Sequence, residues 1–271
     1  MRYLRLTALG LASAAALSAQ APPPPDTWAG TLGGLGLVVP RYAGSSEHRL
    51  LPVPMVEVRF RNRVVLGPSL NGLGIVSLTG YAVRTRRLDV AVVATGLPDR
   101  PASRADALAG TSDRDFAASF GLSVSRRMGP FEATAGGTQG VNAGAGAQGL
   151  ARLGYSRRIG PVFATAAASA ALADAKQMRR EFGVTDAEAA LRLALYQAGD
   201  PRLEARDLGA YSPQGGLRHL AASLGVFYPF ATRWFLLGFG EAQRLSGEAA
   251  ASPLVRRRLQ VSGGAGIGWQ L

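Results

Sequence analysis

The chain has 271 residues and a formal net charge of +12, enough for one large or two small domains. Hydrophobic residues make up 47% of the sequence and charged residues 18%, and the mean hydropathy is +0.10, which fits neither a helical membrane protein nor a disordered chain. Cysteine is absent, which excludes disulfide frameworks, thiolate zinc sites and a lipoprotein anchor.

Residues 1–21 have the pattern of a secretory signal peptide, too short and wrongly flanked for a membrane-spanning helix. The pattern consists of two basic residues, an apolar run and two small residues: Arg2, Arg5, Leu6–Leu17, Ala19 and Ala21. This pattern is compatible with cleavage after Ala19 or after Ala21. Residues 22–27 then form a proline-rich spacer. Removal of the two arginines lowers the net charge to +10, and no later segment has the ~18 continuous apolar residues of a spanning helix.

Residues 28–271 form the expected barrel domain, in which several segments alternate between apolar and small or polar side chains. The alternation is clear in Val56–Phe60, Phe116–Ser125 and Leu220–Phe230, and it runs without interruption from Val255 to Leu271. Strands of about ten residues with one apolar and one polar face are what a transmembrane β-barrel requires. A soluble antiparallel sandwich with one wet face gives a similar pattern. The signal peptide, the strand length and the aromatic final strand favour the membrane.

Connections alternate in length, as expected for short periplasmic turns and longer extracellular loops. The short turns lie at residues 61–63, 86–87, 128–130, 159–161 and 231–233, and the longer loops at 40–50, 98–113, 142–147, 173–216 and 246–254. The segments between them predict an all-β, antiparallel barrel of about 12 strands with both termini in the periplasm. Because Pro68 and several glycines blur two strands in Val64–Thr85, a barrel of 10 strands is the alternative.

One internal repeat supports this layout. The stretch Ser125–Phe131, SRRMGPF, recurs as Ser156–Phe163, SRRIGPVF, one hairpin later. Two equivalent turns at the same rim of a barrel would produce this repeat.

The longest loop contains the one helical pattern of the chain. Thr185 and Glu188 form a capping box ahead of an apolar run that ends at Gly199. We expect a short amphipathic helix on or inside the barrel mouth. It either fills the core of its own loop or acts as a plug.

Four segments together resemble the MipA/OmpV family of outer-membrane proteins. They are GLGLVVPRYAGSSEHRLLPVPMVEVRFRNR, the FGVT of Phe182–Thr185, the YSPQGGLR of Tyr211–Arg218, and GEAAASPLVRRRLQVSGGAGIGWQL at the end. The resemblance covers essentially the whole chain that follows the expected signal peptide. Two departures are visible: the chain ends in Leu271 where the family usually has phenylalanine, and it carries extra residues around Leu191–Leu208.

The resemblance implies an outer-membrane barrel of a Gram-negative bacterium that acts as a non-enzymatic scaffold. In this role it brings a murein-cleaving lytic transglycosylase together with a murein synthase. The last strand is expected to close against the first, Trp28–Val39. Trp269 and Leu271 are similar to the signal read by the barrel assembly machinery. A small pore is the alternative function, with Arg256 and Arg258 as lumen residues that favour anions.

Catalytic residues are sparse in the sequence. The two histidines are His48, beside Glu47, and His219, near Ser223; neither lies in a nucleophile elbow or a zinc-protease motif. Asp113 and Asp115 flank Arg114 and are expected to form a solvated salt-bridge cluster rather than a calcium site. We therefore expect no enzymatic activity, no cofactor and no metal.

Arginine carries almost all of the positive charge, since Lys176 is the only lysine. Nine arginines fall at the predicted periplasmic rim: Arg61, Arg63, Arg86, Arg87, Arg126, Arg127, Arg157, Arg158 and Arg233. They form either a docking surface for acidic proteins or anionic murein, or a set of anchors that reach the lipid headgroups. The group Arg256–Arg258 is expected near lipopolysaccharide phosphates. An exported barrel gives no reason to expect a nucleic-acid partner.

Overall fold

The computed structural model describes residues 28–68, 76–142 and 144–271. The expected signal peptide and spacer lie outside the described residues. Within those ranges no helix is long and apolar enough to cross a membrane.

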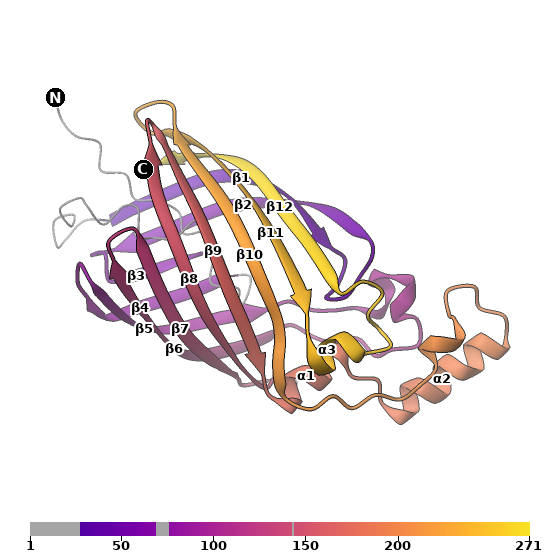
Figure 1. The fold of residues 1–271 in the computed structure, drawn as a ribbon. Coiled ribbons are helices and arrows are strands. Elements are labelled where there is room, and N and C mark those ends of the chain that lie inside the picture. The colour runs from indigo at the N-terminus through magenta and orange to yellow at the C-terminus, as the bar shows by residue number, and fades with distance from the viewer. Residues whose placement is uncertain (1–27, 69–75, 143) are drawn as a thin grey trace.

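Twelve antiparallel strands form a closed barrel in the described part of the chain, in which sequence neighbours pair and β1 pairs with β12 (Figure 1). They are β1 (Trp28–Pro40), β2 (His48–Phe60), β3 (Val64–Pro68), β4 (Val76–Arg84), β5 (Leu88–Leu97), β6 (Ala117–Met128), β7 (Phe131–Gly140), β8 (Ala147–Ile159), β9 (Val162–Ala173), β10 (Gly216–Pro229), β11 (Trp234–Leu245) and β12 (Leu259–Gln270). The predicted barrel is thereby confirmed, with 12 strands and not 10. Each of the described strands has a neighbour on both sides, as a sheet in hydrocarbon requires.

The side-chain alternation divides each strand between the membrane and the lumen. On β6, Phe120 and Leu122 point outward and are exposed, whereas Ala117 and Ser119 point inward and are buried. The outward face is apolar because lipid surrounds it, and the inward face holds the small and polar residues.

Strand β12 begins later than the sequence pattern predicts. The expected start at Val255 is wrong: the residues before Leu259 belong to the preceding loop. The backbone N–H groups of Arg256 and Arg257 donate to the carbonyl of Gly44 at 2.8 and 3.0 Å, outside any strand pair. The expected closure is confirmed, with Thr31 opposite Gln270 and Val38 opposite Gly263.

A cluster of apolar side chains lies inside the barrel, along the wall formed by β9, β10, β11, β12, β1 and β2. This lumen cluster consists of Leu35, Met55, Phe163, Phe227, Phe235 and Leu237. The rings of Phe227 and Phe235 stack at 4.8 Å. Gly268 makes room for them, since a Cβ there would lie 2.2 Å from Phe235 and 2.6 Å from Met55. The alternating glycines of the last strand thus accommodate large side chains of neighbouring strands.

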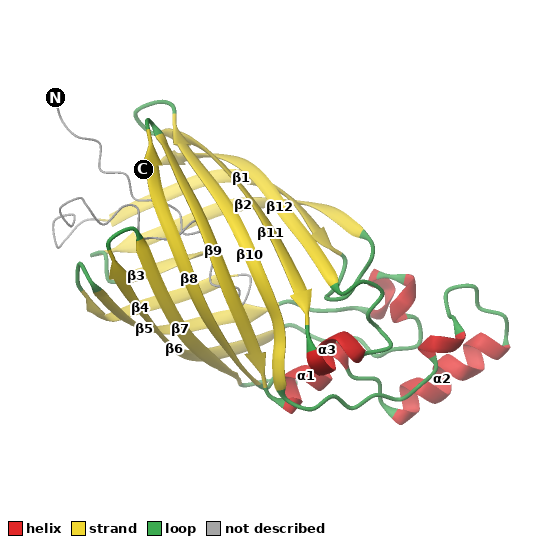
Figure 2. Ribbon diagram, in the orientation of Figure 1, coloured by secondary structure: helices red, strands yellow, loops and turns green. Residues whose placement is uncertain are grey.

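Helices gather at one end of the barrel, and β1 begins and β12 ends at the other (Figures 1 and 2). We call these the long-loop end and the short-turn end. The long-loop end carries α1 (Ala175–Phe182), α2 (Asp186–Gln197) and α3 (Gly247–Ala251), with short 3-10 turns η2 (Ala102–Arg104), η3 (Asp106–Leu108) and η4 (Ala205–Asp207). The predicted capping box of α2 is present. The helix contributes Ala189 to an apolar cluster with Tyr42, Leu108 and Leu254 of other loops, which favours a loop core over a plug.

Candidate functional site

The short-turn end is built from five tight connections. In the two repeated turns, Gly129 and Gly160 have φ values of 62° and 60°, a conformation that glycine adopts without steric cost. A two-residue hairpin turn with glycine first and proline second fits the twist of the strands. The SRRMGPF and SRRIGPVF repeats therefore place equivalent arginine pairs at one rim, as predicted from the sequence.

All nine predicted rim arginines lie in or beside these turns, and eight of them are exposed: Arg61, Arg63, Arg86, Arg87, Arg126, Arg157, Arg158 and Arg233. Arg63 donates to the carbonyl of Ala82 at 3.2 Å and Arg158 to that of Gly160 at 2.9 Å, so both stabilise turns. Among the described residues, four of these side chains make no hydrogen bond or ion pair: Arg86, Arg87, Arg126 and Arg157. These four guanidinium groups are available to a partner.

Arg127 differs from the other eight because its side chain points into the lumen. Its Nη2 lies 2.5 Å from Oδ2 of Asp89 and its Nε 3.1 Å from Oε2 of Glu132. Only 10% of the side chain is exposed. Arg127 belongs to the barrel interior and not to the predicted docking surface, because successive residues of a strand face opposite sides.

Aromatic side chains form a belt on the outer surface of the same end. Its exposed members are Trp28, Phe131, Tyr228, Phe230 and Trp234. Arg61 lies 5.0 Å above the ring of Phe60, and Arg233 lies 5.7 Å from that of Trp269. Such belts mark the interface between membrane and water. This arrangement supports the anchoring interpretation for Arg61 and Arg233.

Charged groups also line the lumen, partly on the same strands as the apolar cluster. Glu57 is buried and accepts a 2.6 Å hydrogen bond from Arg59, and Arg152 of β8 attracts Glu241 of β11. Sequence reasoning missed these residues, although their positions on the inward face of each alternating strand would have identified them. The predicted lumen residues Arg256 and Arg258 lie outside the barrel wall, in the loop before β12.

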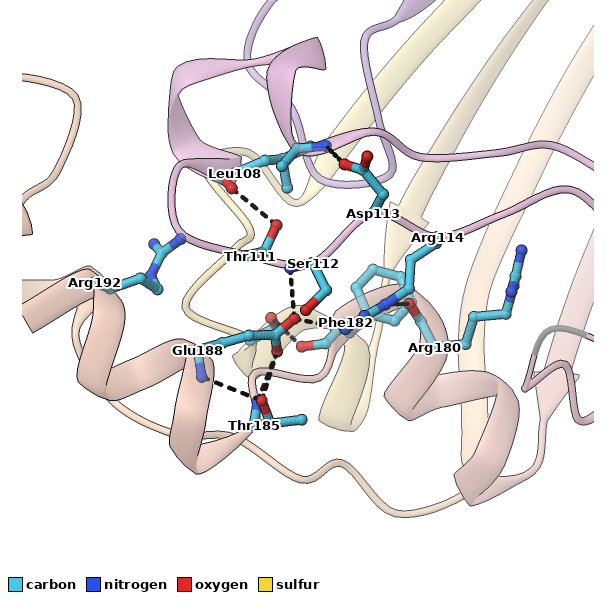
Figure 3. A network of polar contacts seen from close by, with 12 residues as sticks. Leu108, Thr111, Ser112, Asp113, Arg114, Arg180, Phe182, Thr185, Glu188 and Arg192 are labelled. Atoms are coloured by element: carbon cyan, nitrogen blue, oxygen red, sulfur yellow. Dashed lines mark hydrogen bonds and ion pairs between the residues drawn. The ribbon is translucent and has the colours of Figure 1, made fainter.

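Two networks of buried charges hold the loops together at the long-loop end. Glu188 of α2 accepts hydrogen bonds from Thr185 and from the backbone of Ser112, and it pairs with Arg114 at 3.1 Å (Figure 3). Burial alone would raise the pKa of Glu188, but these hydrogen bonds and the charge of Arg114 outweigh it and lower the pKa to about 2. The carboxylate thereby joins the β5–β6 loop to the β9–β10 loop.

The second network centres on Arg192, which is fully buried. Its Nε donates to the carbonyl of Asp207 at 2.7 Å, and its Nη1 donates to the carbonyls of Ala107 and Ala109. Arg256 forms a bidentate pair with the Asp207 carboxylate, with one bond of 2.7 Å. Arg256 therefore connects two loops instead of contacting lipopolysaccharide.

The residues weighed for catalysis or metal binding are dispersed. His48 contacts the carbonyl of Val261 at 2.9 Å, and Nδ1 of His219 accepts a 3.3 Å hydrogen bond from Nε of Arg218. Asp113 accepts a hydrogen bond from the backbone of Ala102, and Arg114 pairs with Glu188 instead of with the aspartates beside it. In the described ranges, no three acidic or histidine residues are grouped to hold a metal ion.

The family model described as "MltA-interacting protein MipA" matches residues 32–271. No curated protein matches the sequence. An outer membrane channel of Pseudomonas putida is similar in structure, with a TM-score of 0.43 and 7% identity over 92% of this chain and 97% of that one. In vitro folded, trimeric OmpT of Vibrio cholerae has a TM-score of 0.39 and 6% identity over 90% of this chain and 98% of its own. OprB of Pseudomonas putida has a TM-score of 0.38 and 9% identity over 81% of this chain, which spans 59% of OprB.

Proposed function

The chain belongs to the MipA family, and from this membership we propose that it is a non-enzymatic scaffold that brings a lytic transglycosylase together with a murein synthase. The protein is a β-barrel of the Gram-negative outer membrane. The family's description names an interaction with MltA, a murein-cleaving enzyme. The barrel would supply the membrane anchor, and one of its ends the docking surface.

The observation that carries the proposal is the set of four unpaired guanidinium groups at the short-turn end. Arg86 and Arg87 lie in the β4–β5 turn, while Arg126 and Arg157 lie on the outward faces of β6 and β8. Guanidinium binds carboxylate and phosphate through two parallel hydrogen bonds, which suits both an acidic protein and anionic murein. Because these four side chains make no hydrogen bond or ion pair among the described residues, their charge is free for recognition.

The proposal requires the short-turn end to face the periplasm. Trypsin added to intact cells should then cleave in the long loops, at the exposed Arg202, and leave Arg86 and Arg126 uncut until the outer membrane is permeabilised. Cleavage at Arg86 in intact cells would show that the short-turn end faces outward and would exclude the proposal.

Two double variants separate docking from anchoring. The assay is capture of murein enzymes from solubilised envelope with the purified barrel as bait. In the docking interpretation, the R86E/R87E variant in the turn no longer retains these enzymes. In the anchoring interpretation, R126E/R157E beside the aromatic belt lowers the yield of inserted barrel, because outward-facing carboxylates meet the lipid headgroups.

The matched control reverses four exposed arginines at the long-loop end: Arg202, Arg206, Arg257 and Arg258. This control carries the same change in net charge as both double variants combined and should retain the enzymes. Equal loss with the control would show that the bait responds to net charge alone. Retention by every variant would exclude the arginine surface.

A pore is the second candidate, favoured by the polar half of the lumen. Buried Thr95, Ser119 and Thr138 line that half together with the Arg127 ion pairs. Purified barrel in a planar bilayer should show discrete conductance steps if the polar half conducts. A barrel without such steps, together with enzyme capture, would support the scaffold alone.

A further inference from the structure

Arg100 is a buried arginine whose side chain has no acceptor. It lies three residues beyond β5, where its backbone pairs with that of Arg114 through hydrogen bonds of 2.7 and 3.0 Å. Only 9% of the residue is exposed. Within the described residues, its Nε, Nη1 and Nη2 have no hydrogen-bond partner. A guanidinium group carries five N–H donors, and a buried charge without an acceptor is costly.

Three other arginines of these loops that are not exposed have protein partners. Arg192 donates to three carbonyls, Arg256 binds the Asp207 carboxylate, and Arg114 binds Glu188. Each of these contacts joins two loops and has an architectural purpose. Arg100 joins nothing through its side chain, so its burial calls for another explanation.

Two carboxylates act on Arg100, and one of them, Glu188, is already engaged. Glu188 accepts four hydrogen bonds: from Ser112, from Arg114, and from the backbone and the hydroxyl of Thr185. A carboxylate has about four lone-pair sites, so this one is saturated.

The second carboxylate, Glu181 of α1, accepts from Gln177 at 2.8 Å and from Arg218 at 3.1 Å through the same oxygen, Oε1. Its other oxygen, Oε2, is buried and has no hydrogen-bond partner among the described residues, so its attraction for Arg100 acts over a distance. Burial lowers the pKa of Arg100 to about 10, to which the neighbouring charge of Arg114 contributes, and the group remains cationic at neutral pH.

We propose that Arg100 is the anchor of a binding site for a small oxyanion, a carboxylate or a phosphate, beneath the loops at the long-loop end. The Glu188 and Arg192 networks hold the surrounding loops together, so the guanidinium group is fixed before a ligand arrives. Its planar fork matches the two oxygens of a carboxylate or phosphate. The site is independent of the docking surface because it lies at the opposite end of the barrel.

Calorimetric titration of the purified barrel in detergent tests the proposal. Sodium phosphate and sodium acetate are titrated at an ionic strength matched with sodium chloride. We expect saturable binding with a Kd on the order of 1 mM or tighter, as suits ligands of about four or five heavy atoms. R100Q should weaken it at least tenfold, R100K should weaken it less because the charge remains without the fork, and R104Q in the same loop should leave it unchanged.

A second measurement needs no variant. Phosphate should slow amide hydrogen exchange in residues 98–116 of the unmodified protein more than sodium chloride of equal ionic strength does. Binding that persists in folded R100Q, or no saturable binding together with unchanged exchange, would overturn the proposal. Protection by lipopolysaccharide and by neither free anion would also overturn it, because the ligand would then be a lipid headgroup.

Discussion

Replacing Glu188 by glutamine should loosen the loop cap while leaving the barrel intact. The glutamine amide keeps one acceptor oxygen but replaces the other with a donor, which faces the donors of Thr185. It also removes the charge that pairs with Arg114, whose side chain is 20% exposed. A pKa lowered from 4.5 to about 2 corresponds to about 3 kcal/mol at neutral pH. Because the carboxylate is only 5% exposed, little of this is lost to solvent screening.

The assay is native-state hydrogen exchange of the loop amides. In E188Q, the opening free energy of residues 112 and 185–189 should fall by about 2–3 kcal/mol, while the barrel strands keep their protection. The matched control is D186N, which removes an exposed carboxylate from the same first turn and should cost at most about 1 kcal/mol through the helix dipole.

The same prediction has a pH dependence. Since the pKa of Glu188 is lower in the folded cap than in the open one, its stabilisation is present above pH 4.5 and is lost as the pH falls towards 2. The opening free energy of these amides should decline over that window in the unmodified protein and should not do so in E188Q. Equal exchange in E188Q and the unmodified protein at pH 7 would refute the reasoning.

Three further predictions concern the barrel. R127M should lower the free energy of unfolding in urea by about 3–5 kcal/mol because it strands two buried carboxylates, whereas outward-facing R126M should change it by less than about 0.5 kcal/mol. G268A should cost about 1–3 kcal/mol in the same assay, since the added Cβ would lie 2.2 Å from a ring of the lumen cluster; G240A, where nothing lies within 4 Å, should be neutral. W269A should slow the appearance of the folded band on unheated gels, and an unchanged rate would argue against an assembly role for this residue.

The barrel was predictable because the membrane imposes a repeating rule on every strand. Apolar outward residues such as Leu122 and Val261 follow from the lipid around them, so period-two patterning reported both the strands and their faces. The end of a strand is not subject to that rule. Val255 and Arg257 continue the alternation, but the backbone N–H of Val255 donates to Ser252 of its own loop and that of Arg257 to Gly44 of another loop.

The sites were less predictable, because contacts between distant residues decide them. Arg126 and Arg127 are adjacent and identical in type, yet one faces lipid and the other binds Asp89 from another strand. The alternation assigns Arg127 to the face of Ser123 and Ser125, and its rim position concealed this. The capping box of α2 was predictable because it is local, whereas the bonds of Arg192 depend on loops more than 80 residues away in sequence.

The arginines of the two ends differ in what they bind, and this difference bears on where the protein acts. At the long-loop end, Arg114, Arg192 and Arg256 have their donors taken up by carbonyls and carboxylates of the loops themselves. At the short-turn end, the turns need few contacts because glycine and proline set their shape, and four guanidinium groups remain unpaired. Exposed Arg257 and Arg258 at the long-loop end also make no side-chain contact among the described residues, so the division separates buried and partly buried arginines from exposed ones. The exposed arginines of the short-turn end and the buried Arg100, which has no side-chain partner among the described residues, are therefore the two places at which we propose that this barrel binds other molecules.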